Sequence, residues 1–223
     1  MTTPQQIRNL LVLLLAVFTL SARAATEPAS PKEVVEKATF GIIAELNKLT
    51  PEQRTEDEVR RLVTTYIVPA IDQEKIAMGA LGKYWRRATP EQRQQFIDRF
   101  RERQIRTYSG AFKAFSGEQF TYEDPRFSPD GSKALVKGML KQTNGQEVPV
   151  DFRLYFDKDT NHWRVYDAVV AGLGMVKTYR DQLAQRLQNS SMDDLLNELA
   201  NEDNAGDEKT EELSAAGTDQ GNS

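Results

Sequence analysis

Residues that could carry out chemistry are scarce in this chain of 223 amino acids. The sequence has no cysteine, which excludes thiol catalysis, disulfide bonds and Cys-ligated metals. Its one histidine, His162, stands beside Trp163 at an expected hairpin turn, where a solvated side chain is far commoner than a catalytic one. Gly172 and Gly174 form too short a pattern for a dinucleotide-binding loop. The residues therefore offer little support for nucleophilic, metal or nucleotide chemistry.

Three aspartates remain as candidates for acid–base chemistry. Asp72 precedes a helical pattern and is expected to cap that helix. Asp151 alternates with Arg153 on an expected strand, which indicates a cross-strand ion pair at the surface. Asp167 lies in the middle of another strand, where a buried carboxyl could act as a general base. A small-molecule enzyme built around Asp167 on a cone-shaped α+β fold is therefore one alternative for the function.

Capping residues and helical periodicity predict the helices around these side chains. Ser30, Thr50 and Thr89 each precede a proline and stand three residues before Glu or Gln, the pattern of a capping box. Apolar residues then recur at intervals of three and four. The predicted helices span 31–49, 56–68, 72–85, 90–115 and 175–187, with a short last helix after Ser191.

Alternating patterns predict four strands, over 120–123, 133–142, 148–157 and 163–171. Asn144-Gly145 separates the second strand from the third and is typical of a tight hairpin. A two-residue loop there would place Leu135, Lys137 and Met139 on one face with Leu154, Phe152 and Val150, and Val136, Leu140 and Tyr155 on the opposite face. Helices, then an antiparallel four-stranded meander, then helices predict an α+β fold.

The two ends of the chain differ from its middle. Arg8, the apolar run Leu10–Leu20 and the small residues around Arg23 are typical of a cleaved signal peptide over residues 1–24. The apolar run has 11 residues, whereas a membrane-spanning helix needs about 20. Residues 201–223 carry seven acidic residues and are expected to form a disordered acidic tail. A single domain over residues 25–200 remains.

This expected domain carries no excess of positive charge. Residues 25–200 contain 26 basic and 26 acidic residues, so the acidity of the chain resides in its tail. A nucleic-acid-binding domain needs a basic surplus to neutralise phosphates. The charge balance therefore argues against a nucleic-acid partner.

Several short strings, taken in order, resemble the MlaC family, also called the toluene-tolerance auxiliary family. The resemblance covers residues 31–199, nearly the whole predicted domain. The strings that carry it are Ile71-Asp72, Leu81-Gly82-Lys83-Tyr84-Trp85-Arg86, Ala88-Thr89-Pro90-Glu91-Gln92-Arg93 with Phe96 and Phe100, Tyr108, Trp163-Arg164-Val165-Tyr166-Asp167, Gly172 and Tyr179-Arg180.

The resemblance implies a monomeric periplasmic carrier of glycerophospholipid that maintains the lipid asymmetry of the outer membrane, and not an enzyme. It implies a curved sheet wrapped by N- and C-terminal helices, with an apolar cavity between them for the acyl chains. The lipid would be the cargo, and no cofactor is implied. The implied partners are an outer-membrane lipoprotein–porin complex and an inner-membrane ABC transporter with an MCE domain.

A carrier of this kind has to enclose the acyl chains of its cargo. Each buried CH₂ group is worth about 0.8 kcal/mol, so two chains lose on the order of 20 kcal/mol if they are exposed to water. We expect the lining to come from apolar residues on the faces defined above. The expected lipid-binding residues are Ile67, Met78, Leu81, Phe100, Tyr108, Phe112, Leu135, Met139, Val150, Phe152, Leu154, Val169, Leu173 and Val176.

Overall fold

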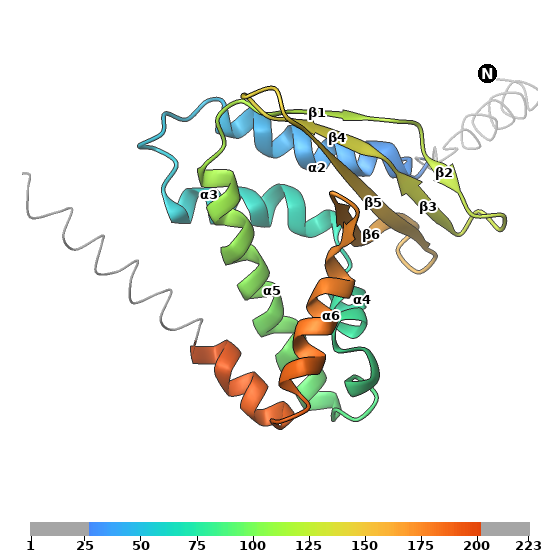
Figure 1. The fold of residues 1–223 in the computed structure, drawn as a ribbon. Helices are drawn as coiled ribbons and strands as arrows, with labels where there is room; N and C mark the ends of the chain where they lie inside the picture. Colours follow the sequence, from blue (N-terminus) through green and yellow to red (C-terminus); the bar gives the residue numbers. More distant parts are fainter. Residues whose placement is uncertain (1–26, 202–223) are drawn as a thin grey trace, which may run out of the picture.

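The computed structural model describes residues 27–201, in which helices precede and follow one curled antiparallel sheet (Figure 1). This order confirms the predicted α+β class. The predicted signal peptide and, except for Asn201, the predicted tail lie outside the described residues. The main helices are α2 (Pro31–Leu46), α3 (Glu56–Leu62), α4 (Gln73–Leu81), α5 (Pro90–Lys113) and α6 (Met175–Arg186), followed by a helical segment over residues 192–201.

Capping residues fix where the long helices begin. Ser30 and Thr89 cap α2 and α5, and each forms the complete capping box with a proline at the start of the helix, as predicted. Thr50 forms the same two hydrogen bonds with Gln53, but only one turn follows. The next helix, α3, begins instead after Thr55, which accepts a hydrogen bond from the Glu58 N–H. A capping box therefore marks a local turn, whether or not a helix continues from it.

The sheet has seven antiparallel strands instead of the predicted four, whereas the predicted neighbours are confirmed: 120–123 pairs with 133–142, 133–142 with 148–157, and 148–157 with 163–171. The strands are β1 (Gln119–Tyr122), β2 (Arg126–Phe127), β3 (Lys133–Val136), β4 (Gly138–Lys141), β5 (Glu147–Asp157), β6 (His162–Val170) and β7 (Leu173–Gly174). The predicted second strand divides at Lys137 into β3 and β4, and both halves pair with the long β5. β6 pairs antiparallel with the other edge of β5.

The hairpin between β4 and β5 has a three-residue loop instead of the predicted two-residue loop. Gly145 adopts a φ of +86° and donates its N–H to the Gln142 carbonyl, while Gln142 pairs with Gln146. The pairing of β3 and β4 with β5 therefore differs by one residue from the predicted pairing. As a result, side chains of β3 and β4 that were predicted for one face of the sheet lie on the other. Val136, not Lys137, lies opposite Phe152, and Leu135 lies opposite Arg153 instead of Leu154.

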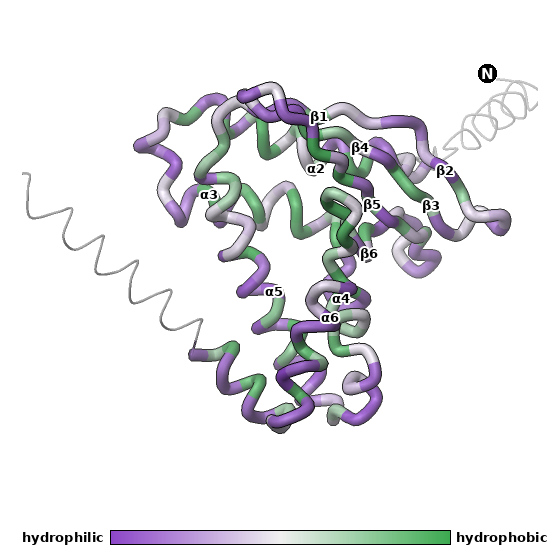
Figure 2. The backbone as a smooth tube through the Cα atoms, viewed as in Figure 1, coloured by the Kyte–Doolittle hydropathy of each residue, from purple (hydrophilic) through white to green (hydrophobic). Residues whose placement is uncertain are grey.

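Buried side chains form three clusters around the centre of the molecule. The first joins α4, α5, α6 and the segment 192–201, and includes Phe96, Phe100 and Leu183. The second joins α2, α3 and the C-terminal part of α5, and the third packs α2 against the sheet. Figure 2 shows apolar segments alternating with hydrophilic ones along α5, the helix that takes part in two of these clusters. The three clusters leave a space between the sheet and the helices.

Candidate functional site

That space is a cavity of about 280 Å³ between the sheet and the helices. A void of about 15 Å³ already holds one water molecule, so this cavity is far larger than a packing defect. Its lining is predominantly apolar, and no Lys, Arg or His is found among the described residues that form it. The lining residues are Val35, Ala38, Thr39, Val63, Ile67, Val68, Ala70, Ile71, Gln73, Ile76, Gln104, Ile105, Tyr108, Phe112, Phe120, Val150, Phe152, Val165, Asp167, Ala168, Val170, Met175, Val176 and Tyr179.

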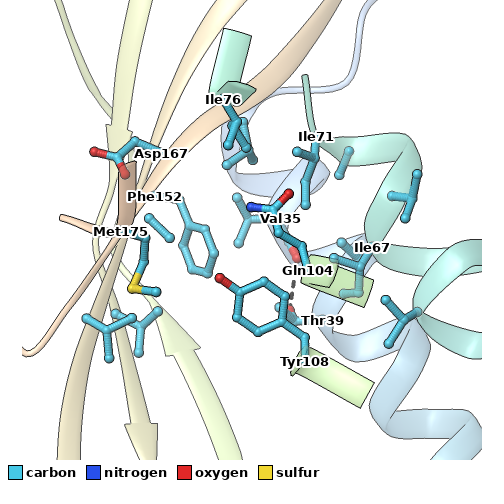
Figure 3. A pocket seen from close by; sticks show the side chains of 18 of the residues that line it. Val35, Thr39, Ile67, Ile71, Ile76, Gln104, Tyr108, Phe152, Asp167 and Met175 are labelled. Atoms are coloured by element: carbon cyan, nitrogen blue, oxygen red, sulfur yellow. Dashed lines mark hydrogen bonds between the residues drawn. The ribbon is translucent and has the colours of Figure 1, made fainter. Parts of the chain in front are cut away.

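Two elements present their side chains to the cavity by simple periodicity. On α5, Gln104, Tyr108 and Phe112 follow each other at intervals of four residues and so occupy one face of the helix. On β5, Val150 and Phe152 alternate with the more exposed Arg153 and share the inner face. Figure 3 shows Tyr108 and Phe152 approaching each other from these two walls.

A π-helical turn, Val63–Ile67, shapes a third wall between α3 and α4. Its closing bond runs from the Val68 N–H to the Val63 carbonyl, five residues earlier. Pro69 follows, and in an α-helix its ring would clash with the carbonyl four residues before it. The wider turn brings Val63, Ile67 and Val68 onto the cavity lining together. A proline that appears only to end a helix thus sets the shape of the cavity.

Two tyrosines meet at the cavity, one from α5 and one from α6. The hydroxyl oxygens of Tyr108 and Tyr179 lie 3.3 Å apart, within hydrogen-bonding distance. Burial raises the pKa of Tyr108 far above its ordinary value, and the neighbouring Tyr179 raises it further. The Tyr108 hydroxyl is therefore neutral at physiological pH, which suits a wall that faces an uncharged ligand.

Asp167 borders the cavity, but its carboxylate is already occupied. It is 5% exposed; its Oδ2 accepts a hydrogen bond from Arg153 Nη1 at 2.9 Å, and its Oδ1 accepts one from the Val176 N–H at 3.0 Å. Arg153 is its register partner, and Figure 3 shows the carboxylate directed away from Phe152 and Tyr108. Arg153 thus forms the expected cross-strand ion pair, with Asp167 as its partner, whereas no ion pair of Asp151 is found in residues 27–201.

The other two candidates for chemistry have structural surroundings. Asp72 caps α4, as predicted, by accepting a hydrogen bond from the Lys75 N–H at 2.8 Å, and it also accepts one from the Tyr155 hydroxyl. His162 is exposed at the hairpin between β5 and β6, where its Nδ1 lies 2.5 Å from the Thr160 carbonyl. Neither residue lines the cavity.

The structure brings six of the fourteen expected lipid-binding residues to the cavity lining. These six are Ile67, Tyr108, Phe112, Val150, Phe152 and Val176. Helical spacing on α5 and strand alternation on β5 identified four of them correctly as neighbours. Contact with a lipid stays a prediction for all six.

The other eight lie elsewhere, for three physical reasons. Leu81, Phe100 and Leu154 fill solid core clusters. Leu135, Met139 and Val169 lie opposite Arg153, Pro149 and Asp151, on the outer face of the sheet. Met78 and Leu173 are 43% and 68% exposed.

Sequence reasoning missed the contribution of α2 and the polar group on α5. Val35, Ala38 and Thr39 line the cavity from α2, and none of them is among the expected lipid-binding residues. Their spacing of three and four residues carried a signal, but the same spacing describes a packed helix equally well. Gln104 was overlooked because a glutamine within a charged helix is usually solvated, whereas here it is buried.

Residues 27–201 contain neither a candidate membrane span nor a candidate metal cluster. No helix in this range combines the length and the apolar character needed to cross a membrane. The same residues contain no group of three or more His, Asp or Glu side chains placed to hold a metal ion.

Comparisons with known proteins agree with this architecture. The chain is 29% identical over 192 residues to the toluene tolerance protein ttg2D of Pseudomonas putida, covering 83% of this chain and 84% of that protein. It is 22% identical over 193 residues to the intermembrane phospholipid transport system binding protein MlaC of Haemophilus influenzae, covering 86% and 90%.

A solved structure extends the likeness to three dimensions. The phospholipid-binding protein of Ralstonia solanacearum, determined in complex with a phospholipid, superposes with a TM-score of 0.69 at 30% identity, covering 83% of this chain and 99% of that one. The family model described as MlaC protein matches residues 36–201, which include every element around the cavity except the first turn of α2. The chain belongs to the MlaC protein family.

Proposed function

We propose that this protein is a periplasmic carrier that shuttles glycerophospholipid between the outer and inner membranes and so maintains the lipid asymmetry of the outer membrane. The observation that carries the proposal is the apolar cavity between β5, β6 and the helices. The phospholipid found in the related Ralstonia structure supports the choice of cargo. The cavity residues, including Ile67, Phe112 and Val150, then contact the acyl chains.

The energetics favour a cavity that is filled. At about 24 cal/mol per Å³, a dry and empty cavity of this size would lower stability by roughly 7 kcal/mol. The whole stability of a domain is about 5–15 kcal/mol. Hydrocarbon chains remove this penalty and gain their own transfer free energy, so cargo and protein stabilise each other.

The carboxylates in and near the cavity favour lipid transport over catalysis, because they are engaged in structural contacts. The carboxylate of Asp167 is held by Arg153 and by the N–H of Val176, so a proton abstraction would have to break both contacts. Asp72 is committed to capping α4. We therefore propose a carrier without enzymatic activity and without a cofactor other than its lipid cargo.

Export and the membrane partners belong to the same proposal. We propose that residues 1–24 are a cleaved signal peptide, that residues 25–200 form one domain, and that the acidic tail follows it. The monomer would exchange lipid with an outer-membrane lipoprotein–porin complex and with an inner-membrane ABC transporter that has an MCE domain. The name of the Haemophilus relative, a binding protein of an intermembrane transport system, supports this arrangement.

A lipid-transfer assay between vesicles tests the proposal. Donor vesicles with labelled phosphatidylglycerol and unlabelled acceptor vesicles are separated by a filter that passes only protein. We expect the wild type to move label, and Ala38→Trp to move several-fold less because its ring enters the cavity from α2. Ala44→Trp places the same ring on the exposed face of α2 and should act like the wild type. Movement of label no faster than without protein would refute the proposal.

A further inference from the structure

The cavity wall contains a polar group that no contact within the described protein accounts for. Gln104 is 8% exposed and projects from α5 into the cavity, where Figure 3 shows its amide among Val35, Ile71 and Ile76. No residue between 27 and 201 forms a hydrogen bond with this side chain, whereas Thr39 nearby is bonded to both Val35 and Tyr122. The amide atoms of Gln104 are open to the cavity, so a ligand that fills the cavity with hydrocarbon alone would bury them without a partner, which is unfavourable.

A second donor lies one helical turn away on the same face. Tyr108 follows Gln104 by four residues, and its hydroxyl pairs with that of Tyr179. A pair of hydroxyls has two protons but uses one of them in the shared bond, and no described acceptor takes the other. The cavity wall thus presents the Gln104 amide and one unused hydroxyl proton, on α5 or α6, inside an otherwise apolar space.

The charges around the cavity decide which acceptor can reach these donors. The described lining contains the carboxylate of Asp167 and no cationic side chain. A phosphate placed there would be a buried anion without a partner, which is strongly unfavourable. An ester carbonyl is neutral, accepts hydrogen bonds, and connects the glycerol to each acyl chain. It is the polar group that must enter when the chains are buried and the phosphate stays outside.

We infer that the side-chain amide of Gln104 donates a hydrogen bond to an acyl ester carbonyl of the cargo, and so selects ester-linked over ether-linked lipid. This inference rests on the proposed carrier function and adds a chemical selection to it. The hydroxyl pair of Tyr108 on α5 and Tyr179 on α6 extends the polar strip along which the ester groups lie. The acyl chains occupy the apolar remainder of the cavity.

Competition between two lipids tests the inference. The full-length mature protein, freed of bound lipid, is incubated with vesicles containing equal amounts of diester phosphatidylglycerol and its dialkyl ether analogue with chains of the same length. Native mass spectrometry then gives the ratio of the two complexes. Loss of one buried hydrogen bond changes affinity about fivefold, so we expect the wild type to favour the diester by about that factor.

Matched variants separate the contribution of Gln104 from general effects. Gln104→Leu should bind the diester and the diether in a ratio near one. If this variant does not fold, Gln104→Met, whose side chain has the length of glutamine, should show the same ratio. Gln95→Leu makes the same change on the exposed face of α5 and should keep the wild-type ratio. A ratio near one in the wild type, or an unchanged preference in both Gln104 variants, overturns the inference. If the wild type binds neither lipid, the carrier proposal itself fails.

Discussion

Arg153 and Asp167 form an ion pair across β5 and β6, with Arg153 Nη1 2.9 Å from Asp167 Oδ2. The second carboxylate oxygen of Asp167 accepts the N–H of Val176 near the start of α6. One buried carboxylate therefore joins two strands of the sheet to the helix that closes the cavity. The aspartate that looked most like a general base from its position is a structural link between the walls.

Replacing this carboxylate should affect stability more than cargo. Asp167→Asn removes the charge and presents an amide to the guanidinium of Arg153, so we expect a loss of about 1.5 kcal/mol in the free energy of unfolding. The partial exposure of Arg153 keeps the loss below that of a fully buried pair. Urea denaturation measures the change. Asp151→Asn, for which no ion pair is found in residues 27–201, should change stability by less than about 0.5 kcal/mol. Equal effects of the two substitutions would contradict the assigned role.

Gly138 of β4 pairs with Tyr122 of β1 at a position that has no room for a side chain. A Cβ atom at this position would lie 2.8 Å from the Val150 carbonyl oxygen and 2.8 Å from Cε1 of Tyr122. Because the carbonyl belongs to the backbone and cannot move aside, we expect Gly138→Ala to lower stability by about 2 kcal/mol. Gly110→Ala, in the open helix position of α5, should instead raise stability by about 0.5–1 kcal/mol. Thermal unfolding of both variants checks the opposite signs; a shared sign would show that the close approach is not limiting.

Alkaline pH should destabilise the protein through Tyr108. Its pKa is raised by burial, so in the folded state it keeps its proton at pH values where the unfolded chain, with a tyrosine pKa of about 10, has lost it. Stability from this group is complete below pH 10 and falls as the pH rises further. Tyr108→Phe should therefore lose less stability than the wild type between pH 8 and pH 11. Urea midpoints at the two pH values measure this difference, and an identical loss in both proteins would exclude Tyr108 as the cause.

Removal of bound lipid should lower the melting temperature. For a domain of this size, 1 kcal/mol corresponds to roughly 2–4 °C. The cavity penalty of roughly 7 kcal/mol then predicts a decrease of about 14–28 °C after complete extraction if the cavity stays open and dry. Calorimetry before and after extraction, with reloading as the control, gives the value. An unchanged melting temperature after verified extraction would mean that the cavity closes without cargo.

The sequence predicted the local structure well and the faces of the sheet poorly. Ser30 and Thr89 marked the starts of α2 and α5 because a capping box acts over four residues. Asn144-Gly145 marked a hairpin correctly, but the loop length, on which the register depends, was set by the φ of one glycine. That one-residue difference moved Leu135 and Met139 to the outer face.

The cavity depends on long-range packing that periodicity cannot report. Phe100 and Phe112 lie on the same helix, yet Phe100 fills a core cluster and Phe112 lines the cavity. Nothing in the sequence near either residue distinguishes the two cases. Phe100 packs against Phe96 and Tyr179, whereas Phe112 packs beside the cluster of α2 and α3 and borders the cavity. Gln104 carried the strongest hidden signal, because a buried amide is unusual, but its burial is visible only after folding.

Native mass spectrometry of the protein purified from its native host cells tests the central claim most directly. Lipid released on denaturation is identified in the same experiment. We predict a complex with stoichiometric phospholipid, whose mass gives the number of acyl chains that the cavity holds. A bare polypeptide mass that persists after incubation with phospholipid vesicles would contradict the carrier function and return attention to Asp167.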